Sequence, residues 1–438
     1  MPDSASARAT QPATLALAVL GVAVLFNFVG RGLADSFTAF VLPLEQHFGW
    51  RRSEITGVFA SYMLMNGLFA PFIGLVFDRF GPRVVYCLGL LALGLGALLA
   101  SRAQALWQLY LSAGVLVGIG VSATGQTCAT ALIARWYRAR LATAIALVYA
   151  GAGMGMLVIV PLAQTLIEAT DWRTTWQWLG VMALALIPVC ALLPWRRLAR
   201  PADETDADCL SRPGSNRAAR SASGRPGPRV AEALRTPAFW RLVQTFFFTA
   251  FANYLVTPQI VAYLIETGLP PILAASAYGF TGLLSTIGVV AAGWLSDRYG
   301  IQRVALFSLG SSITGIFGLL LASWFPGLAA LALFVACFGL AQGARGPIVS
   351  ALCNRIFEGP SAASINGLVF ASLALGASLG AWLGGVIIDW SEGYRMLFLL
   401  SMILFAVAAE AYRSGSVLIR LTAGWKQSAV PRTNQRPR

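Results

Sequence analysis

Residues 74–83 read GLVFDRFGPR, and residues 293–303 read GWLSDRYGIQR. Each stretch has a glycine four residues before an aspartate, then an arginine, an aromatic residue, a second glycine and a closing arginine. Each also follows a long apolar run. An internal repeat of this kind indicates a chain built from two related halves, an arrangement typical of paired helical bundles around a central site.

The composition excludes a soluble protein. Hydrophobic residues make up 57% of the chain and charged residues only 11%, against roughly 25% charged residues in an ordinary soluble domain. The apolar residues form long runs, for example 14–30, 84–100, 175–194 and 304–323. Runs of about 17 residues or more can cross a hydrocarbon core of roughly 30 Å. We therefore expect an all-α membrane protein.

The apolar runs predict twelve transmembrane helices. The predicted spans are 14–41, 53–76, 84–100, 106–133, 141–167, 174–194, 239–265, 272–295, 303–322, 327–351, 362–388 and 395–420. The first six form an N-terminal bundle over 14–194, and the last six form a C-terminal bundle over 239–420. The rest of the chain is an N-terminal tail (1–13), a linker (195–238) and a C-terminal tail (421–438).

The linker and the basic residues predict the orientation. Residues 195–238 are rich in Arg, Ser, Pro, Gly and Asp, with few large apolar residues, so we expect this linker to be disordered. Most arginines of the short loops lie on the same side as the linker and both termini, and the positive-inside rule makes that side cytoplasmic. Lys426 is the only lysine, which suggests a GC-rich bacterial source and thus the bacterial inner membrane.

The formal net charge of +14 could suggest a nucleic-acid partner. The arginines, however, sit in short loops, the linker and the C-terminal tail. No basic stripe is interleaved with aromatic residues on which bases could stack. The expected surroundings of the protein are therefore the lipid bilayer, without nucleic acid, and we expect a monomer.

The repeated loop G-x-x-x-D-R-[FY]-G-x-x-R, one residue shorter in its first copy, resembles the signature of the major facilitator superfamily. The resemblance covers essentially the whole chain, because the loop follows the second and the eighth of six plus six predicted helices. In that family the loops latch the cytoplasmic side when the carrier faces outward, with aspartates at helix ends meeting positive charge. The gating residues that the resemblance implies are Gly74, Asp78, Arg79, Gly81, Arg83, Gly293, Asp297, Arg298, Gly300 and Arg303.

Shorter stretches are similar to the monocarboxylate and oxalate/formate branch of that family. They are FVLPL at 40–44 with FGWRRS at 48–53, WQLY at 107–110, GAGMG at 151–155 and YRMLF at 394–398. Animal-type members of the branch carry an acid and an arginine inside the eighth span. Here residues 278–296 carry no charge.

Few charged residues lie within the predicted spans. Arg31 and Asp35 are four residues apart, on one helical face, and Arg345 stands between glycines ahead of Pro347, which suggests a locally opened helix. A charge at mid-membrane costs at least about 2.5 to 3.5 kcal/mol, so such residues usually serve a function. We expect Arg31 and Arg345 to bracket an anion, since guanidinium groups match carboxylates.

Asp35 would neutralise Arg31 in the empty carrier or carry a proton. The alternative is structural: Arg31 and Asp35 would form a supporting ion pair, and Arg345 would bond backbone carbonyls. Uncharged polar residues within the spans are further candidates for binding substrate, although such residues also join helices. They are Asn27, Tyr62, Gln126, Tyr149, Asn253, Tyr254, Gln259 and Asn366.

No pattern indicates catalysis, a metal or a cofactor. There is no P-loop, no CxxC pair among the six cysteines and no nucleophile–base pair in the spans. The sequence thus predicts a secondary active transporter that moves a small organic anion, a mono- or dicarboxylate, by alternating access. A proton gradient or exchange would drive it. A proton-coupled exporter of drugs or other amphipathic compounds remains an alternative, as does a non-transporting sensor, and the residues leave the substrate and the direction open.

Overall fold

The fold is described here from a computed structural model. It describes residues 3–133, 136–137, 141–195, 230–324, 327–357, 362–391 and 393–413. The predicted linker and C-terminal tail therefore lie mostly outside the described residues. Throughout the described part the chain is helical, which confirms the predicted all-α fold.

The N-terminal half contains the first six predicted spans. Its helices are α1 (Asp3–Asp35), α2 (Phe37–Phe48), α3 (Arg52–Phe80), α4 (Pro82–Ser101), α5 (Leu106–Leu109), the π-helix η1 (Tyr110–Leu116), α6 (Val117–Thr124), α7 (Gln126–Ile133), α8 (Leu141–Ala169) and α9 (Trp172–Leu192). The first span, Leu15–Phe48, is formed by α1 and α2 together; it ends later than the predicted 14–41 and is interrupted at Ser36.

The C-terminal half repeats the pattern after the linker. Its helices are α12 (Val230–Ala233), α13 (Pro237–Val256), the 3-10 turn η2 (Thr257–Gln259), α14 (Ile260–Glu266), α15 (Pro271–Tyr299), α16 (Ile301–Ala322), α17 (Leu328–Ile356), α18 (Ala362–Ser391) and α19 (Arg395–Glu410). The turn η2 includes Pro258, which has no backbone N–H to continue the helix. The helix α17 is unbroken through Gly346 and Pro347, so the predicted local opening was wrong.

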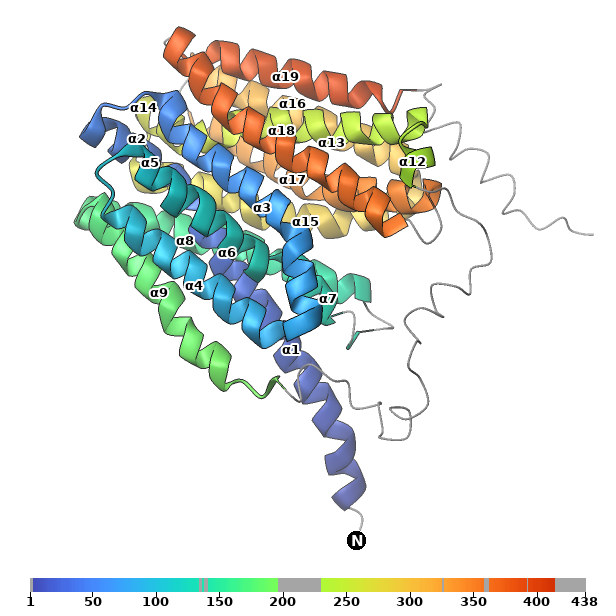
Figure 1. The fold of residues 1–438 in the computed structure, drawn as a ribbon. Helices are drawn as coiled ribbons and strands as arrows, with labels where there is room; N and C mark the ends of the chain where they lie inside the picture. The colour runs from blue at the N-terminus through green and yellow to red at the C-terminus, as the bar shows by residue number, and fades with distance from the viewer. Residues whose placement is uncertain are drawn as a thin grey trace, which may run out of the picture.

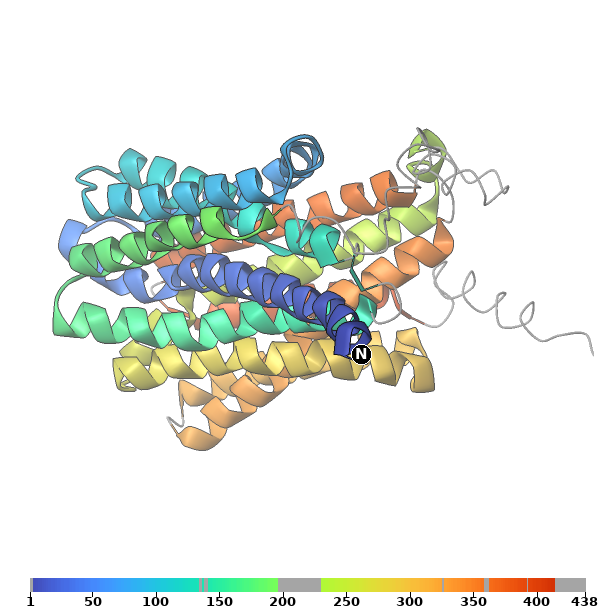
Figure 2. The same ribbon diagram turned by 90° about the horizontal axis from the view of Figure 1, so that it is seen from below.

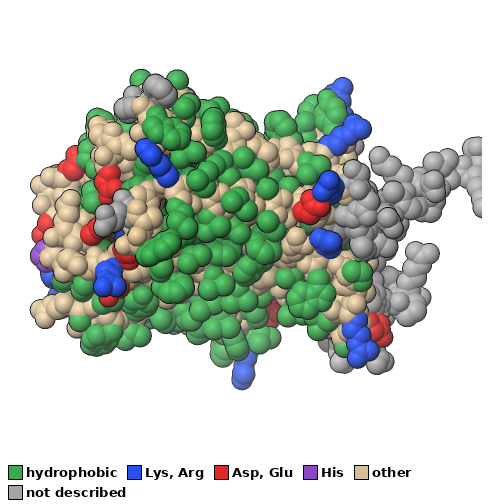
Figure 3. Space-filling model, turned by 90° about the horizontal axis from the view of Figure 1, so that it is seen from above, with side chains coloured by type: hydrophobic (Ala, Val, Ile, Leu, Met, Phe, Trp, Pro, Cys, Tyr) green, Lys and Arg blue, Asp and Glu red, His purple; other side chains and the backbone are tan. Residues whose placement is uncertain are grey.

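Eleven helical segments within the described residues are long and apolar enough to cross a membrane. The twelfth predicted span corresponds to α19, which has 16 residues and ends at Glu410, earlier than the predicted 420. Hydrophobic side chains cover the middle of the molecule, and most charged side chains lie toward its two ends (Figure 3). This distribution is the one that a lipid-embedded protein needs, because charge is costly in hydrocarbon.

The two halves lie against each other along two helix pairs (Figures 1 and 2). The helix α3 packs along α18, and α8 packs along α15. Close approach depends on small residues: a Cβ at Gly153 of α8 would meet the backbone of Gly282 on α15. We call the end with the repeated loops and the linker the inner end, and the opposite end the outer end.

Within the C-terminal half, α18 packs on α13 through glycines at four-residue spacing. A Cβ at Gly380 would meet the carbonyl oxygen of Phe251, so no larger residue fits without a shift of the backbone. The Gly376–Gly384 run is therefore a helix-packing face.

We predict that Gly380→Ala lowers the free energy of unfolding by about 1 to 3 kcal/mol, because the added methyl group overpacks the α13–α18 contact. The matched control is Gly367→Ala on the same helix, where an added Cβ has no neighbour within 4 Å. The control should leave stability unchanged or raise it by up to about 1 kcal/mol, through helix propensity. Thermal unfolding of both purified variants in detergent checks this, and equal melting temperatures would contradict the packing.

Candidate functional site

Two arginines, one from each half, lie at mid-depth in the bundle. Arg31 is 16 residues after Leu15 and 17 residues before Phe48, the ends of the first span. Arg345 is 17 residues after the start of α17 at Leu328 and 11 residues before its end at Ile356. With a rise of about 1.5 Å per residue, both side chains start near the middle of a hydrocarbon core of roughly 30 Å.

All three nitrogen atoms of the Arg31 guanidinium have a hydrogen-bond acceptor. Nε donates to Oδ2 of Asp35 at 2.7 Å, which is also an ion pair one helical turn along α1. Nη1 donates to the hydroxyl of Tyr62 on α3 at 3.3 Å, and Nη2 donates to the hydroxyl of Tyr254 on α13 at 3.1 Å. The predicted Arg31–Asp35 contact therefore exists, and Arg31 also reaches across to the C-terminal half.

Asp35 is buried, whereas its ion-pair partner Arg31 is partly exposed. The Asp35 side chain is 1% exposed and the Arg31 side chain is 25% exposed. The second carboxylate oxygen of Asp35, Oδ1, has no hydrogen-bond partner in the described part of the chain. A buried carboxylate with a free oxygen is a group that can accept a proton.

Arg345 is held entirely by neutral side chains of its own half. Nη1 donates to Oδ1 of Asn253 on α13 at 3.4 Å, and Nη2 donates to the hydroxyl of Ser312 on α16. The guanidinium carbon lies 4.7 Å from the ring centroid of Phe405 on α19, a cation–π contact. Among the described residues no carboxylate forms an ion pair with Arg345, and its Nε has no partner.

The helix α13 brings the two arginines to one place. Its consecutive residues Asn253 and Tyr254 contact Arg345 and Arg31, respectively. The central site thus combines two guanidinium groups, one carboxylate and several hydroxyl groups, which together carry a net positive charge.

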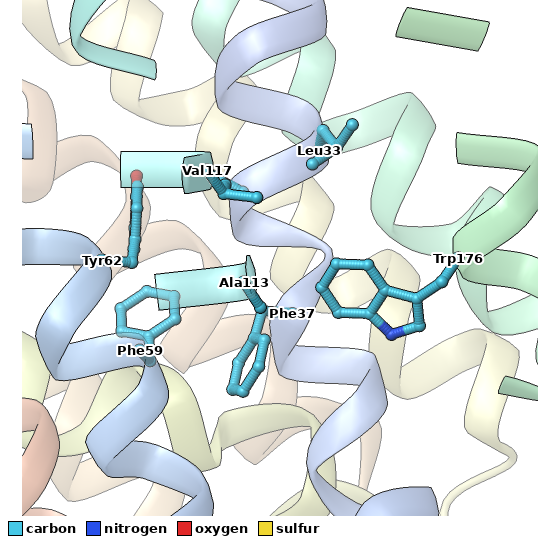
Figure 4. Close-up of a pocket in the computed structure, with 8 residues that line it drawn as sticks. Leu33, Phe37, Phe59, Tyr62, Ala113, Val117 and Trp176 are labelled. Carbon is cyan, nitrogen blue, oxygen red and sulfur yellow. The ribbon is translucent and has the colours of Figure 1, made fainter. Parts of the chain in front are cut away.

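Aromatic side chains fill the space between Arg31 and the outer end. The side chains of Phe37, Phe59 and Trp176 surround a cavity of about 10 Å³, and Tyr62 lines it as well (Figure 4). Such a volume holds about one water molecule. The ring of Phe59 also lies 6.2 Å from that of Tyr254, so the aromatic layer extends across both halves. These packed rings leave a cavity of only this size among them, on the outer side of Arg31.

Among the described residues, the predicted gating loops at the inner end form no ion pair with each other. Asp78, Arg79 and Arg83 are exposed, and so is Arg298. Of the charged side chains that the structure describes in these two loops, none takes part in an ion pair. Arg79 lies over the ring of Phe80 instead, and Arg298 lies over the rings of Trp294 and Tyr299. The side chain of Asp297 lies outside the described residues.

The remaining predicted site residues have other surroundings. Asn27 is buried and donates to the backbone oxygen of Val148 at 2.8 Å, so it joins α1 to α8. Gln259 is buried in η2, and neither its amide oxygen nor its amide nitrogen has a partner in the described part. Gln126 begins α7, and Tyr149 lies within α8; both are partly exposed. Their contacts do not connect them to either arginine.

Sequence reasoning missed two residues of the central site. They are Ser312 and Phe405, which contact Arg345. Serine and phenylalanine are common in membrane helices, and nothing in the local sequence marks these particular positions. Tyr62, one of the uncharged candidates, is a direct partner of Arg31. The described residues include no group of three or more His, Cys, Asp or Glu side chains able to hold a metal ion.

Known proteins resemble this chain over most of its length. A sequence profile described as Major Facilitator Superfamily matches residues 20–355. Bovine monocarboxylate transporter 13 is 28% identical over 373 residues, covering 84% of this chain and 82% of the relative. Rat monocarboxylate transporter 4 is 26% identical and covers 91% and 82%, respectively. The MFS-type transporter YcxA of Bacillus subtilis is 24% identical and covers 88% and 92%.

Solved structures share the fold at lower sequence identity. A bacterial homologue of the human lysosomal transporter Spinster, in an inward-facing and unoccupied conformation, superimposes with a TM-score of 0.69 at 15% identity, covering 94% of this chain and 98% of that one. The nucleoside transporter NupG superimposes with a TM-score of 0.70 at 14% identity, covering 90% and 98%. The chain therefore belongs to the major facilitator superfamily: it is a multi-pass membrane transport protein and not an enzyme.

Proposed function

We propose that the protein is a secondary active transporter that moves a small organic anion, a mono- or dicarboxylate, across the membrane by alternating access. The observation that carries this proposal is the state of Arg345. Its guanidinium is at mid-depth and has no acidic partner among the described residues. An unneutralised charge in this position is costly, and an anionic ligand would remove the cost.

A carboxylate fits both arginines. Guanidinium groups offer two parallel N–H donors that match the two oxygens of a carboxylate. On Arg31 the hydroxyl groups of Tyr62 and Tyr254 occupy the two terminal nitrogens at 3.3 and 3.1 Å, where carboxylate oxygens would bind more strongly. The substrate would thus bridge Arg31 of the N-terminal half and Arg345 of the C-terminal half.

Asp35 is the proposed proton-coupling residue. It neutralises Arg31 in the empty carrier through the 2.7 Å ion pair. When a substrate carboxylate takes over that neutralisation, the buried Asp35 would be left as an excess negative charge, and protonation would remove it. Anion and proton would then bind together, as in symport, and exchange of two anions would need no net proton movement.

The two bundles, 14–194 and 239–420, would rock about this site. The closed aromatic layer and the unlatched inner loops favour an inward-facing conformation. The repeated loops, with Asp78, Arg79 and Arg83 in one half and their counterparts in the other, would latch the inner end in the outward-facing state. We place the inner end, the linker and both termini in the cytoplasm by the positive-inside rule, in a bacterial inner membrane, and propose a monomer.

The names of the relatives support the same substrate class. Three different vertebrate relatives that cover more than four fifths of this chain are named monocarboxylate transporters. Their identities of 24 to 28% support a carboxylate but not a particular one.

We predict that Arg345→Gln, or Arg31→Gln, lowers the initial rate of carboxylate uptake by about 100-fold, because the bound anion loses a buried charged partner. Purified variants would be reconstituted into proteoliposomes and offered a panel of radiolabelled small carboxylates. The matched control is Arg102→Gln, which removes an exposed arginine in an outer loop and should transport like the parent protein.

Normal carboxylate uptake by both central variants would contradict the proposal. If the parent protein transported no carboxylate but lowered the accumulation of amphipathic cations in vesicles with a pH gradient, the alternative of a drug exporter would replace it. Counterflow measured in the same vesicles distinguishes both cases from a sensor that binds without transport.

We predict that Asp35→Asn abolishes the stimulation of uptake by an inward proton gradient, because the buried proton acceptor is gone. The same change leaves Arg31 without its counter-charge, so the KM for the anion should fall. The conservative variant Asp35→Glu keeps a titrating carboxyl group and should retain the stimulation. Initial rates with and without a pH gradient check this, and a full response to the gradient in Asp35→Asn would contradict the assignment.

A further inference from the structure

A second charged cluster joins the two halves at the outer end. Its centre is Arg52, the first residue of α3, whose side chain is only 4% exposed although it lies at the end of a span. Nη2 of Arg52 forms an ion pair with Glu266, the last residue of α14, at 2.8 Å. Nη1 donates to the hydroxyl of Tyr394, just before α19, at 3.1 Å. Both partners belong to the C-terminal half.

Asp389, near the end of α18, completes the cluster by a different kind of contact. Its two carboxylate oxygens accept hydrogen bonds from the backbone N–H groups of Arg52 and Ser53, each at 2.9 Å. These N–H groups belong to the first turn of α3 and have no partner inside that helix. The carboxylate of one half thus caps a helix of the other half, where the helix dipole favours negative charge.

The backbones of α3 and α18 also touch at this point. A Cβ added to Gly385 would meet the Cα and backbone nitrogen of Ser53. A glycine at this position allows the approach that the Asp389 cap requires. Separation of the two halves here would break all four hydrogen bonds at once, and the described charged residues of the inner loops form no ion pair that replaces them.

Arg52 has one further partner, and that partner is in its own half. Glu45 of α2 forms an ion pair with Nη2 of Arg52, the same nitrogen that binds Glu266. If the halves parted, Glu266, Asp389 and Tyr394 would leave with the C-terminal half, and Glu45 would stay with Arg52. The described part of the cluster contains three carboxylates and one arginine, so Arg52 never needs to be unpaired.

Tyr394 contributes as a neutral group. It lies in the short connection between α18 and α19, outside the membrane-spanning segments. Burial raises the pKa of the Tyr394 phenol above its ordinary value, with Arg52 acting in the opposite direction. The hydroxyl therefore remains protonated at neutral pH and accepts the hydrogen bond of Arg52 without adding another charge.

We propose that Arg52, with Asp389, Glu266 and Tyr394, forms the outer gate of the transporter, and that Glu45 is the partner that keeps Arg52 neutralised when the gate is open. The gate stabilises the inward-facing conformation and must break before substrate can reach Arg31 and Arg345 from outside. This assignment depends on alternating access by a transporter of this family and not on the carboxylate nature of the substrate.

Hydrogen–deuterium exchange of the full-length protein in lipid nanodiscs tests the gate without any substrate. In Arg52→Gln, amides at the outer ends of α3 and α18 should exchange about tenfold faster, the factor expected when one or two charge-assisted bonds are lost. Amides of the inner loops at 74–83 and 293–303 should exchange more slowly, because an outward-facing molecule closes at the inner end. The opposite changes at the two ends separate gate opening from general destabilisation.

The chain offers a matched control in the adjacent residue. Arg51 is exposed and forms no ion pair with any described residue, so Arg51→Gln should leave both ends unchanged. Glu266→Gln and Asp389→Asn should act in the same direction as Arg52→Gln, and either can serve if that variant fails to fold. Glu45→Gln should not speed exchange at the outer end. It removes the carboxylate that pairs with Arg52 in the open state, so it disfavours the open state more than the closed one.

Faster exchange at both ends of the Arg52, Glu266 and Asp389 variants would show a structural role only and would overturn the gate. Unchanged exchange in all three variants would overturn it as well. The result for carboxylate uptake by the Arg345 and Arg31 variants has no bearing on this outcome, so the gate and the proposed substrate class can fail separately.

Discussion

The proposed mechanism depends on one unusual state of charge: the guanidinium of Arg345 lies deep in a membrane bundle, and no acid among the described residues neutralises it. Hydroxyl, amide and aromatic groups hold it in place, yet none of them cancels its charge. Since Arg31 already has Asp35, the centre of the molecule keeps an excess positive charge between its two halves. In the proposed mechanism an anion would complete this centre as the protein moves between inward and outward states, and it would contact both halves at once.

Ion pairs on either side of this centre would decide which way it opens. At the outer end, two kinds of contact join the halves: the Arg52 side chain binds the Glu266 carboxylate, and the Asp389 carboxylate accepts hydrogen bonds from backbone N–H groups at the start of α3. At the inner end, the described charged residues of the repeated loops are exposed and unpaired. Only one end would be closed at a time, because a rigid-body movement that brings the two halves together at one end must separate them at the other. The aromatic layer of Phe37, Phe59 and Trp176 separates the site from the closed end.

The sequence predicted the fold well because hydropathy and the repeated loop are local signals. The position of Arg31 four residues before Asp35 also predicted their ion pair, since residues at this spacing meet on a helix. Contacts between helices could not be predicted in the same way. Nothing in the sequence indicates that consecutive residues of α13 meet the two arginines, or that Arg52, which resembles an ordinary outer-loop arginine, is buried at a junction of four helices. Pro347 misled the prediction, because α17 continues through it as one helix.

The central claim is that the positive charge at Arg345 selects an anion, and a binding measurement tests it most directly. The purified protein would be titrated with a small carboxylate and with the amide of the same acid, which has the same shape but no charge, while the melting temperature is recorded. The account predicts that the carboxylate raises the melting temperature of the parent protein, as any ligand of the native state must, and that the amide does not. In Arg345→Gln the carboxylate and the amide should have the same effect. Equal stabilisation by acid and amide, or an acid effect that persists in Arg345→Gln, would contradict it.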